Sequence, residues 1–210
     1  MIVVWDFDNT LFDTARFKED AQRAFADWGV GAVSFERAYQ RIVDDSSGGH
    51  GYDPEAHLAK LSRRLNRASR DSLRRHIDLL VADAASYLFP GALDLVSRLS
   101  ERNWRQVLLT LGNQAWQERK VAASGLEQLM DEVLAVEADK SAAVASLSRR
   151  DDLLVVNDNS REIVGMMRAA PEARYILVDG PKAGLIDTGL RPVEGIAGIS
   201  RMMREMGLRI

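Results

Sequence analysis

The chain opens with Ile2-Val3-Val4-Trp5-Asp6-Phe7-Asp8-Asn9-Thr10-Leu11-Phe12, which joins a short hydrophobic run to two closely spaced carboxylates. The β-branched residues at positions 2–4 predict a buried strand. Asp6 and Asp8 follow that strand where the chain turns through Asn9 and Thr10. At the carboxyl end of a strand, side chains of this kind converge on a crevice. Two like charges so close raise one pKa or demand a cation between them, so this segment favours a nucleophile, a proton carrier and a metal.

The composition predicts a globular protein. At 210 residues, of which 46% are apolar, the chain fits one large domain or one domain carrying a smaller insert. The net charge of −3 gives no general basic field to hold nucleic acid or an anionic membrane. The chain has no cysteine, which excludes disulfides, thiolate metal sites and thiol nucleophiles. Met1 leads directly into a strand without a basic region or a long apolar segment, so we expect a cytoplasmic protein.

Helical patterning dominates residues from about 15 to 86. Four amphipathic stripes at helical spacing can be recognised there, with no strand pattern among them. Their apolar residues are Phe17, Ala21, Phe25 and Trp28; Phe35, Ala38 and Ile42; Leu58, Leu61 and Leu65; and Leu73, Ile77, Leu80, Val81 and Ala84. Four such helices can bury their stripes against one another as a small bundle.

From Tyr87 onward, strand and helix patterns alternate. We predict strands at 106–110, 133–136, 153–156 and 175–178, and helices at 114–124, 140–147, 160–169 and 193–206. Alternation of this kind requires crossover connections and a mostly parallel sheet with helices on both faces. The sequence therefore predicts an α/β core made of residues 1–13 and 87–210, with residues 14–86 inserted as an α-helical cap. An insert that emerges beside the crevice can act as a lid.

Each later strand leads to a polar residue that can face the same crevice. Thr110 ends one strand and is followed by Leu111, Gly112 and Asn113. Its hydroxyl and the adjacent backbone N–H groups, at the entrance to a helix, are suited to binding a phosphate oxygen. Lys140 places a cation at the start of a helix. Asp158 follows another strand, with Glu162 four residues beyond. Oxygen ligands in this number, without His or Cys, favour a hard ion such as Mg²⁺.

On these motifs the chain resembles the haloacid dehalogenase-like hydrolase superfamily, specifically its phosphatase branch with a helical cap after the first motif. The segment from Asp6 to Thr10 resembles the D-x-D-x-T signature, and Thr110 ends the strand of the second motif. Lys140 suits the third motif, and Asp158 with its neighbours suits the fourth, acidic one. Residues 87–91 resemble the segment that re-enters the core after the cap. The resemblance covers essentially the whole chain and implies a Rossmann-like sheet.

The resemblance implies a phosphatase that acts on a small phosphorylated metabolite. Asp6 would attack phosphorus and form an aspartyl-phosphate. Asp8 would donate a proton to the leaving oxygen and then take one from the attacking water. Thr110, Leu111 and Lys140 would bind the transferring phosphoryl group, and Thr110 and Lys140 would neutralise and hold it during catalysis.

The resemblance also implies a Mg²⁺ cofactor, held by Asp6, Asp158 and the backbone carbonyl of Asp8. The fourth motif departs from the family at two positions. It has Asn157 where glycine is common, and Glu162 where the second acid is commonly aspartate. The longer Glu162 side chain can still reach the ion or a ligating water, which leaves its role open.

Asp8 favours phosphoryl transfer over dehalogenation, because a halide leaves without a proton and the family's dehalogenases lack this second aspartate. Two alternatives stay open. One is a phosphomutase on a sugar phosphate, which uses the same core but excludes water until the phosphoryl group is returned. The other is a non-catalytic phosphate-binding or regulatory protein with a retired active site. The sequence does not fix the substrate or the oligomeric state.

Several of these residues also have plainer interpretations. Asp6 and Asp8 could cap a turn, and Asp158 could cap the helix that follows it. Thr110 could be only a hydroxyl at a strand end. Lys140 competes with Lys120, which we expect on a solvated helix face.

Weaker signals lie elsewhere in the chain. The loop that contains His50 either closes over the site or is an ordinary exposed loop. Six arginines between Arg63 and Arg75 make the predicted cap locally basic, and we expect most of them to be solvated. Trp5 and the methionines at 202, 203 and 206 are expected to serve packing.

Overall fold

The computed structural model of this chain describes residues 1–45, 51–61 and 66–210. Its sheet has the strand order β3-β2-β1-β4-β5, and all four neighbouring pairs are parallel. The carboxyl ends of all five strands therefore lie at one edge, with β1 at the centre. The strands are β1 (Ile2–Trp5), β2 (Arg105–Leu111), β3 (Glu132–Val136), β4 (Leu153–Asn157) and β5 (Arg174–Leu177).

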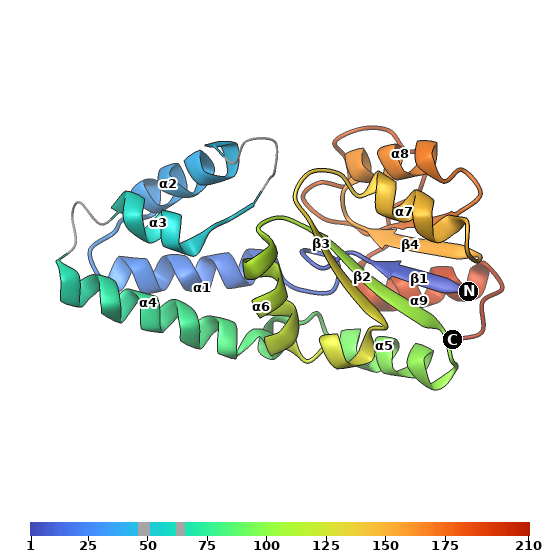
Figure 1. Cartoon of the computed structure of the whole chain (residues 1–210), viewed down its shortest axis with the longest axis horizontal. Helices are drawn as coiled ribbons and strands as arrows, with labels where there is room; N and C mark the ends of the chain where they lie inside the picture. Colours follow the sequence, from blue (N-terminus) through green and yellow to red (C-terminus); the bar gives the residue numbers. More distant parts are fainter. Residues whose placement is uncertain (46–50, 62–65) are drawn as a thin grey trace.

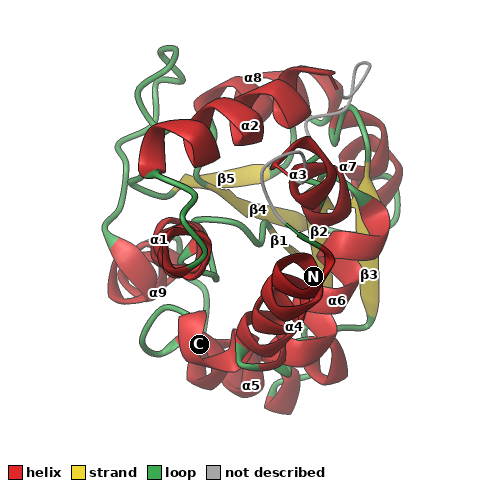
Figure 2. Ribbon diagram, turned by 90° about the vertical axis from the view of Figure 1, so that its left-hand side faces the viewer, coloured by secondary structure: helices red, strands yellow, loops and turns green. Residues whose placement is uncertain are grey.

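Helices cover both faces of this sheet (Figure 2). On one face lie α7 (Ser141–Ser148) and α8 (Ser160–Ala169), and on the other lie α5 (Ala92–Glu101) and α9 (Gly195–Glu205). Alternate residues of β1 enter different clusters, Ile2 and Val4 on the α7–α8 side and Val3 and Trp5 on the other. This follows from the period-2 alternation of strand side chains, and burial on both faces is typical of parallel sheets.

Four helices between β1 and β2 pack together at one end of the sheet (Figure 1). We call them the cap helices: α1 (Thr14–Asp27), α2 (Ala32–Asp45), α3 (Pro54–Leu61) and α4 (Arg67–Ala82). The side chain of Asp13 accepts from Arg16 N at the start of α1, and that of Asn66 accepts from Ser69 N at the start of α4. The apolar stripes of these helices join the same cluster as Val3 and Trp5.

A short 3-10 helix, η2 (Ala84–Tyr87), returns the chain from α4 to the core, and α6 (Gln114–Ser124) follows β2. Gly51, which lies shortly before α3, approaches the start of α6 closely. A Cβ added at Gly51 would lie 2.5 Å from the backbone nitrogen of Asn113, so a side chain there would force the two segments apart. Gly51 therefore permits the cap helices to approach the end of β2.

The predicted α/β fold with a parallel sheet flanked by helices is confirmed. The bounds of α6 and α8 agree with prediction, and the strands differ by one residue at either end. Trp5 is fully buried and its Nε1–H donates to Gln106 Oε1 at 3.0 Å, so its packing role is confirmed, as is that of fully buried Met203. No helix within the described parts of the chain has the length and apolar character needed to cross a membrane.

His57 of α3 is fully buried in an aromatic cluster of the cap helices. Its ring lies 5.0 Å from that of Phe25 and 4.7 Å from that of Phe35. Its Nε2 is 3.2 Å from the carbonyl oxygen of Phe35, which can only accept, so Nε2 carries the proton. Its Nδ1 therefore accepts from the hydroxyl of Tyr52 at 2.9 Å. Burial lowers the pKa of His57 to about 4, and the imidazole is neutral.

This neutral histidine makes stability depend on pH. Above pH 6.5 the folded and unfolded states both carry neutral His57, and the group contributes nothing to pH dependence. As the pH falls from 6.5 to 4, only the unfolded chain gains the proton, and the free energy of unfolding drops by about 3 kcal/mol. In His57→Gln, which keeps a donor and an acceptor, this loss is expected to vanish.

Urea unfolding of both proteins at several pH values measures the effect. The carboxylates titrate in both, so the difference in stability between them isolates His57. A difference that stays constant from pH 7 to pH 4 would show that the histidine titrates normally in the fold.

Candidate active site

A cavity of about 240 Å³ lies at the carboxyl edge of the sheet, beneath the cap helices. All the polar residues predicted from strand ends line it, although they come from four separate parts of the chain. Leu111 lines it as well. The predicted residues gathered there are Asp6, Asp8, Thr110, Lys140, Asp158 and Glu162.

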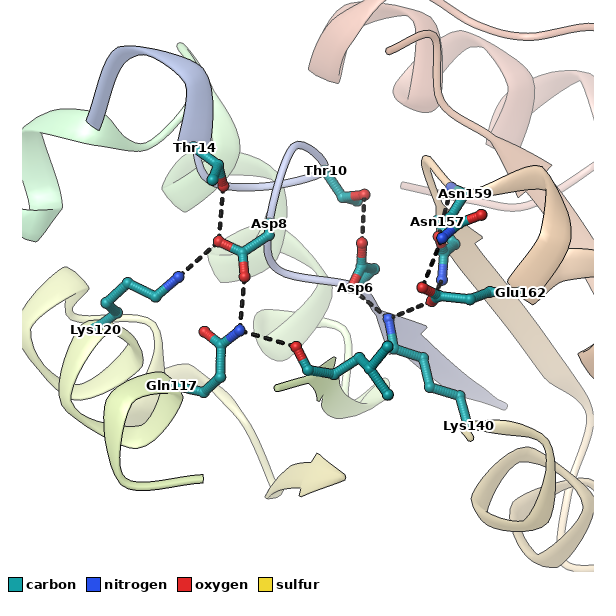
Figure 3. Close-up of polar contacts among 11 residues, drawn as sticks. Asp6, Asp8, Thr10, Thr14, Gln117, Lys120, Lys140, Asn157, Asn159 and Glu162 are labelled. Carbon is teal, nitrogen blue, oxygen red and sulfur yellow. Dashed lines mark hydrogen bonds and ion pairs between the residues drawn. The ribbon is translucent and has the colours of Figure 1, made fainter. Parts of the chain in front are cut away.

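A buried ion pair links β1 to the start of α7 (Figure 3). Lys140 Nζ lies 2.5 Å from Asp6 Oδ1 and 2.8 Å from Glu162 Oε2, and the lysine side chain is only 2% exposed. Thr10 donates its hydroxyl to the other oxygen of Asp6 at 3.1 Å. Burial disfavours charge on Lys140, but the two carboxylates outweigh it and raise the pKa of this ammonium. Lys140 is therefore a fixed cation beside Asp6.

For Asp6, the effect of burial on the pKa outweighs the effect of its charged partner. Burial raises the pKa of its carboxyl, while Lys140 lowers it and nearby Glu162 raises it again. The net direction is upward, which weakens the acid and strengthens the carboxylate as a base or nucleophile. The backbone turns sharply beyond Asp6, with Asn9 in the left-handed region at φ 61°, a conformation that asparagine tolerates.

Glu162 forms the second ion pair of Lys140 and is itself held by two asparagines. Its Oε2 accepts from Asn157 Nδ2 at 3.0 Å, and its Oε1 accepts from Asn159 Nδ2 at 2.8 Å. Together with the bond to Lys140, these contacts occupy both carboxylate oxygens (Figure 3). Asn157 stands where a glycine was expected, and its amide holds Glu162 in place. These contacts favour a positioning role for Glu162 over metal ligation.

The carboxylate of Asp8 is surrounded by hydrogen-bond donors from α1 and α6. Lys120 Nζ lies 2.6 Å from its Oδ1, Thr14 donates to the same oxygen at 2.7 Å, and Gln117 Nε2 donates to Oδ2 at 2.7 Å. Burial raises the pKa of Asp8, but Lys120 and the other donors outweigh it and lower the pKa below its ordinary value. In this structure Asp8 is therefore a carboxylate.

The expected solvated position of Lys120 is wrong. This residue is 3% exposed, and its ammonium lies 5.2 Å from the ring centroids of both Phe7 and Phe12. The error arises because α6 is short of apolar residues, so part of its inward face must be polar. Gln117 and Lys120 lie three residues apart on the face that also buries Val121. That spacing, set against exposed Glu118 and Arg119, was the available signal.

Three buried oxygens of residues that line the cavity have no hydrogen-bond partner among the described residues: Thr110 Oγ1, Gln117 Oε1 and Asp158 Oδ2. An unpaired buried carboxylate oxygen costs free energy unless a donor or cation meets it. Burial and the charge of Asp6 raise the pKa of Asp158 to about 8. The site is thus electrostatically incomplete beside Asp6 and Asp158, which is what a cation would relieve.

The residues present fit a hard divalent ion. Asp6 and Asp158 supply two carboxylates, and Asp8, whose carboxylate is occupied by donors, retains its backbone carbonyl. Across residues 1–45, 51–61 and 66–210, no three His, Cys, Asp or Glu side chains are grouped for metal binding. Two carboxylates and one carbonyl do not make such a group, and Mg²⁺ commonly keeps several waters.

The weaker signals of the predicted cap have mixed outcomes. His50, Arg63 and Arg64 lie outside the described residues. Arg74 forms a bidentate pair with exposed Glu55, and Arg75 donates to Ser72. No arginine lines the cavity within the part of the chain that the structure describes.

Comparison with known proteins gives a family match. The model of the haloacid dehalogenase-like hydrolases matches residues 3–172. No curated protein matches the sequence. Three solved structures share the fold over nearly the whole chain. One is a candidate haloacid dehalogenase-like hydrolase from Burkholderia xenovorans LB400, with 23% identity, a TM-score of 0.66 and an alignment over 99% of this chain and 98% of that chain. Another is the candidate HAD-hydrolase YfnB from Bacillus subtilis bound to magnesium, with 16% identity, a TM-score of 0.62 and an alignment over 99% of this chain and 98% of that chain. The third is a candidate beta-phosphoglucomutase from Thermotoga maritima, with 17% identity, a TM-score of 0.63 and an alignment over 97% of this chain and 98% of that chain.

Proposed function

Since this chain belongs to the haloacid dehalogenase-like hydrolases, we propose that it is a Mg²⁺-dependent phosphatase of small phosphorylated molecules. The observation that carries the proposal is the position of buried Lys140 2.5 Å from Asp6, in a cavity that also contains Asp8, Thr110 and Asp158. A fixed cation beside a nucleophile, with a proton carrier two residues away, is what phosphoryl transfer requires.

In the first step, a carboxylate oxygen of Asp6 attacks phosphorus as the bond from phosphorus to the ester oxygen breaks. Lys140 and the hydroxyl of Thr110 bind the phosphoryl oxygens as negative charge is redistributed. Thr110 Oγ1 has no partner among the described side chains and backbone groups, so it is available to donate to such an oxygen. In the second step, water attacks phosphorus and Asp6 is released.

Asp8 moves the protons. It gives one to the leaving oxygen in the first step and takes one from water in the second. Its carboxylate is charged in the structure because of Lys120, so it must be protonated before the first step. A phosphate dianion that binds nearby repels this carboxylate and raises its pKa, which opposes the effect of Lys120.

Removing Lys120 is therefore expected to change the pH profile. With Lys120→Met, the pKa of Asp8 rises, and the basic limb of kcat/KM moves up by roughly one pH unit. Arg119→Met, which removes an exposed neighbour paired with Asp78, is the matched control and leaves the limb in place. Identical pH profiles for Lys120→Met and the wild type would contradict this role.

Mg²⁺ would be held by Asp6, Asp158 and the backbone carbonyl of Asp8. When bound, the ion supplies positive charge that offsets repulsion between the nucleophile and the phosphate. The unpaired Oδ2 of Asp158 supports this assignment.

Metal removal tests the proposal. We expect phosphate release from p-nitrophenyl phosphate to fall by roughly 10²–10³-fold after treatment with EDTA and to recover with added Mg²⁺. Mg²⁺ alone should raise the melting temperature of the wild type, and Asp158→Asn should abolish that shift. Full activity of the metal-free protein would contradict the cofactor assignment. Absence of phosphate release from any monoester would contradict the phosphatase.

A further inference from the structure

The cavity extends from the acidic residues toward the cap helices, where its wall is apolar. Aromatic and aliphatic side chains from three cap helices and from α6 line this part. The residues are Phe17 and Ala21 of α1, Phe35 and Tyr39 of α2, Ile77 of α4 and Trp116 of α6. In a phosphatase, the group attached to the phosphate points away from the nucleophile, so this wall faces the leaving group of the substrate.

Two polar side chains that line the same part of the cavity, Tyr52 and Lys18, already have partners. The hydroxyl of Tyr52 donates to His57 Nδ1 at 2.9 Å, and the protonated Nε2 of that ring donates to a backbone carbonyl. Lys18 Nζ lies 2.8 Å from Glu36 and 4.1 Å from the ring centroid of Tyr39. The hydroxyl of Tyr39 is one further polar group in this wall, so few groups remain for the several hydroxyls of a sugar.

Besides Thr110 and Asp158, which the proposed mechanism uses, Gln117 keeps an unpaired acceptor near the acids. Gln117 donates through Nε2 to Asp8 and to the carbonyl of Leu111, and its Oε1 has no partner among the residues described. This oxygen can accept from one donor close to the reacting ester. It cannot satisfy the several hydroxyls of a sugar ring.

We propose that the substrate is a phosphate monoester whose leaving group is a small apolar alcohol, aliphatic or aromatic. This inference rests on the proposed phosphatase function. The volume of about 240 Å³ agrees with it, since a dry apolar cavity of roughly 150 Å³ holds benzene, which leaves room for a phosphoryl group. Each sugar hydroxyl buried here without a partner lowers kcat/KM roughly tenfold or more.

Two substrates of the same skeleton test the proposal. Cyclohexylmethyl phosphate and glucose 6-phosphate both join a six-membered ring through CH₂ to the ester oxygen. The sugar is the better intrinsic leaving group because its oxygens withdraw electrons, so chemistry alone does not favour the cyclohexyl ester. We expect kcat/KM for cyclohexylmethyl phosphate to be about 100-fold higher or more. Equal values, or a preference for the sugar, would overturn the proposal.

A variant of the wall links this preference to the cavity. Ala21→Leu fills the apolar end, and we expect it to lower kcat/KM for cyclohexylmethyl phosphate about tenfold more than for methyl phosphate, which does not reach that end. Ala26→Leu makes the same change on the exposed side of α1 and is the matched control. A fall of equal size for both substrates would count against the assigned wall.

Ligand binding separates this inference from the proposed function. Calorimetry with Asp6→Asn compares the affinities of the two phosphates without turnover and leaves the wall unaltered. Preferential binding of cyclohexylmethyl phosphate by a protein that hydrolyses neither ester would sink the phosphatase and keep the apolar site. Hydrolysis of both esters by the wild type, with equal binding of the two by the variant, would support the phosphatase and contradict the apolar site. A failure of the variant to bind either ester would also contradict the apolar site.

Discussion

Asp6→Asn is expected to abolish phosphate release, with a loss of about 10⁴-fold or more in kcat. The amide is a poor nucleophile and cannot form the acyl phosphate. Stability should be preserved, because the substitution removes a buried charge that repels Asp158 and Glu162. Lys140 keeps its contact with Glu162 at 2.8 Å.

The measurement is the initial rate on p-nitrophenyl phosphate with saturating Mg²⁺, together with thermal unfolding of the variant. Asp151→Asn, which removes an exposed carboxylate paired with the amino terminus, is the control for the same chemical change elsewhere. Wild-type turnover in Asp6→Asn would reject the nucleophile. A variant that is inactive because it has unfolded would be recognised by its melting curve.

Lys140→Met should have the second largest effect, because it damages both the site and the fold. Two carboxylates, Asp6 and Glu162, lose the cation that lies 2.5 and 2.8 Å away. Breaking a buried pair in this way costs about 3–5 kcal/mol of stability at neutral pH. Activity should fall by roughly 10²–10³-fold, because the charge that stabilises the transferring phosphoryl group is removed.

The pH dependence of this loss has a definite sign. Without Lys140, burial and mutual repulsion raise the pKa of both carboxyls in the folded state above their unfolded values. Each then takes up a proton in the fold as the pH falls, so the destabilisation relative to the wild type is largest at neutral pH and shrinks toward acidic pH. Denaturant unfolding at pH 5 and pH 7.5 checks this trend. A destabilisation that grows on acidification would contradict the buried pair.

Glu162→Gln offers a milder companion to this variant. It removes one charge but keeps an oxygen acceptor and the side-chain length. If Glu162 positions Lys140, then the pH profile of activity should change more than the affinity for Mg²⁺. A large loss of Mg²⁺ affinity would instead make Glu162 a metal ligand.

Much of this arrangement could be predicted from local patterns. Alternation of strand and helix after Tyr87 fixes a parallel sheet, and parallel strands direct their ends to one edge. Asp6 and Asp158 directly follow strands and Thr110 lies at the end of β2, so their convergence required no knowledge of side-chain contacts. Lys140 follows β3 by a short loop, and the same argument placed it.

The partners of Asp8 could not be predicted in the same way. Gln117 and Lys120 lie on a helix whose polar residues face both inward and outward, so hydrophobic periodicity does not orient it. The apolar residues that line the cavity could not be predicted from the sequence for a related reason. An apolar stripe shows which side of a cap helix is buried, but residues such as Phe17 and Phe35 pack against neighbours and line the cavity at once.

The covalent intermediate gives the most direct test of this account. Wild-type protein is mixed with Mg²⁺ and substrate, quenched in acid within one turnover and digested for peptide mass spectrometry. We predict one phosphoryl group on the peptide that contains Asp6, located on Asp6 itself and absent from the Asp6→Asn protein. Rapid turnover with no phosphoryl group on the chain, or with the group on Asp8, would contradict it.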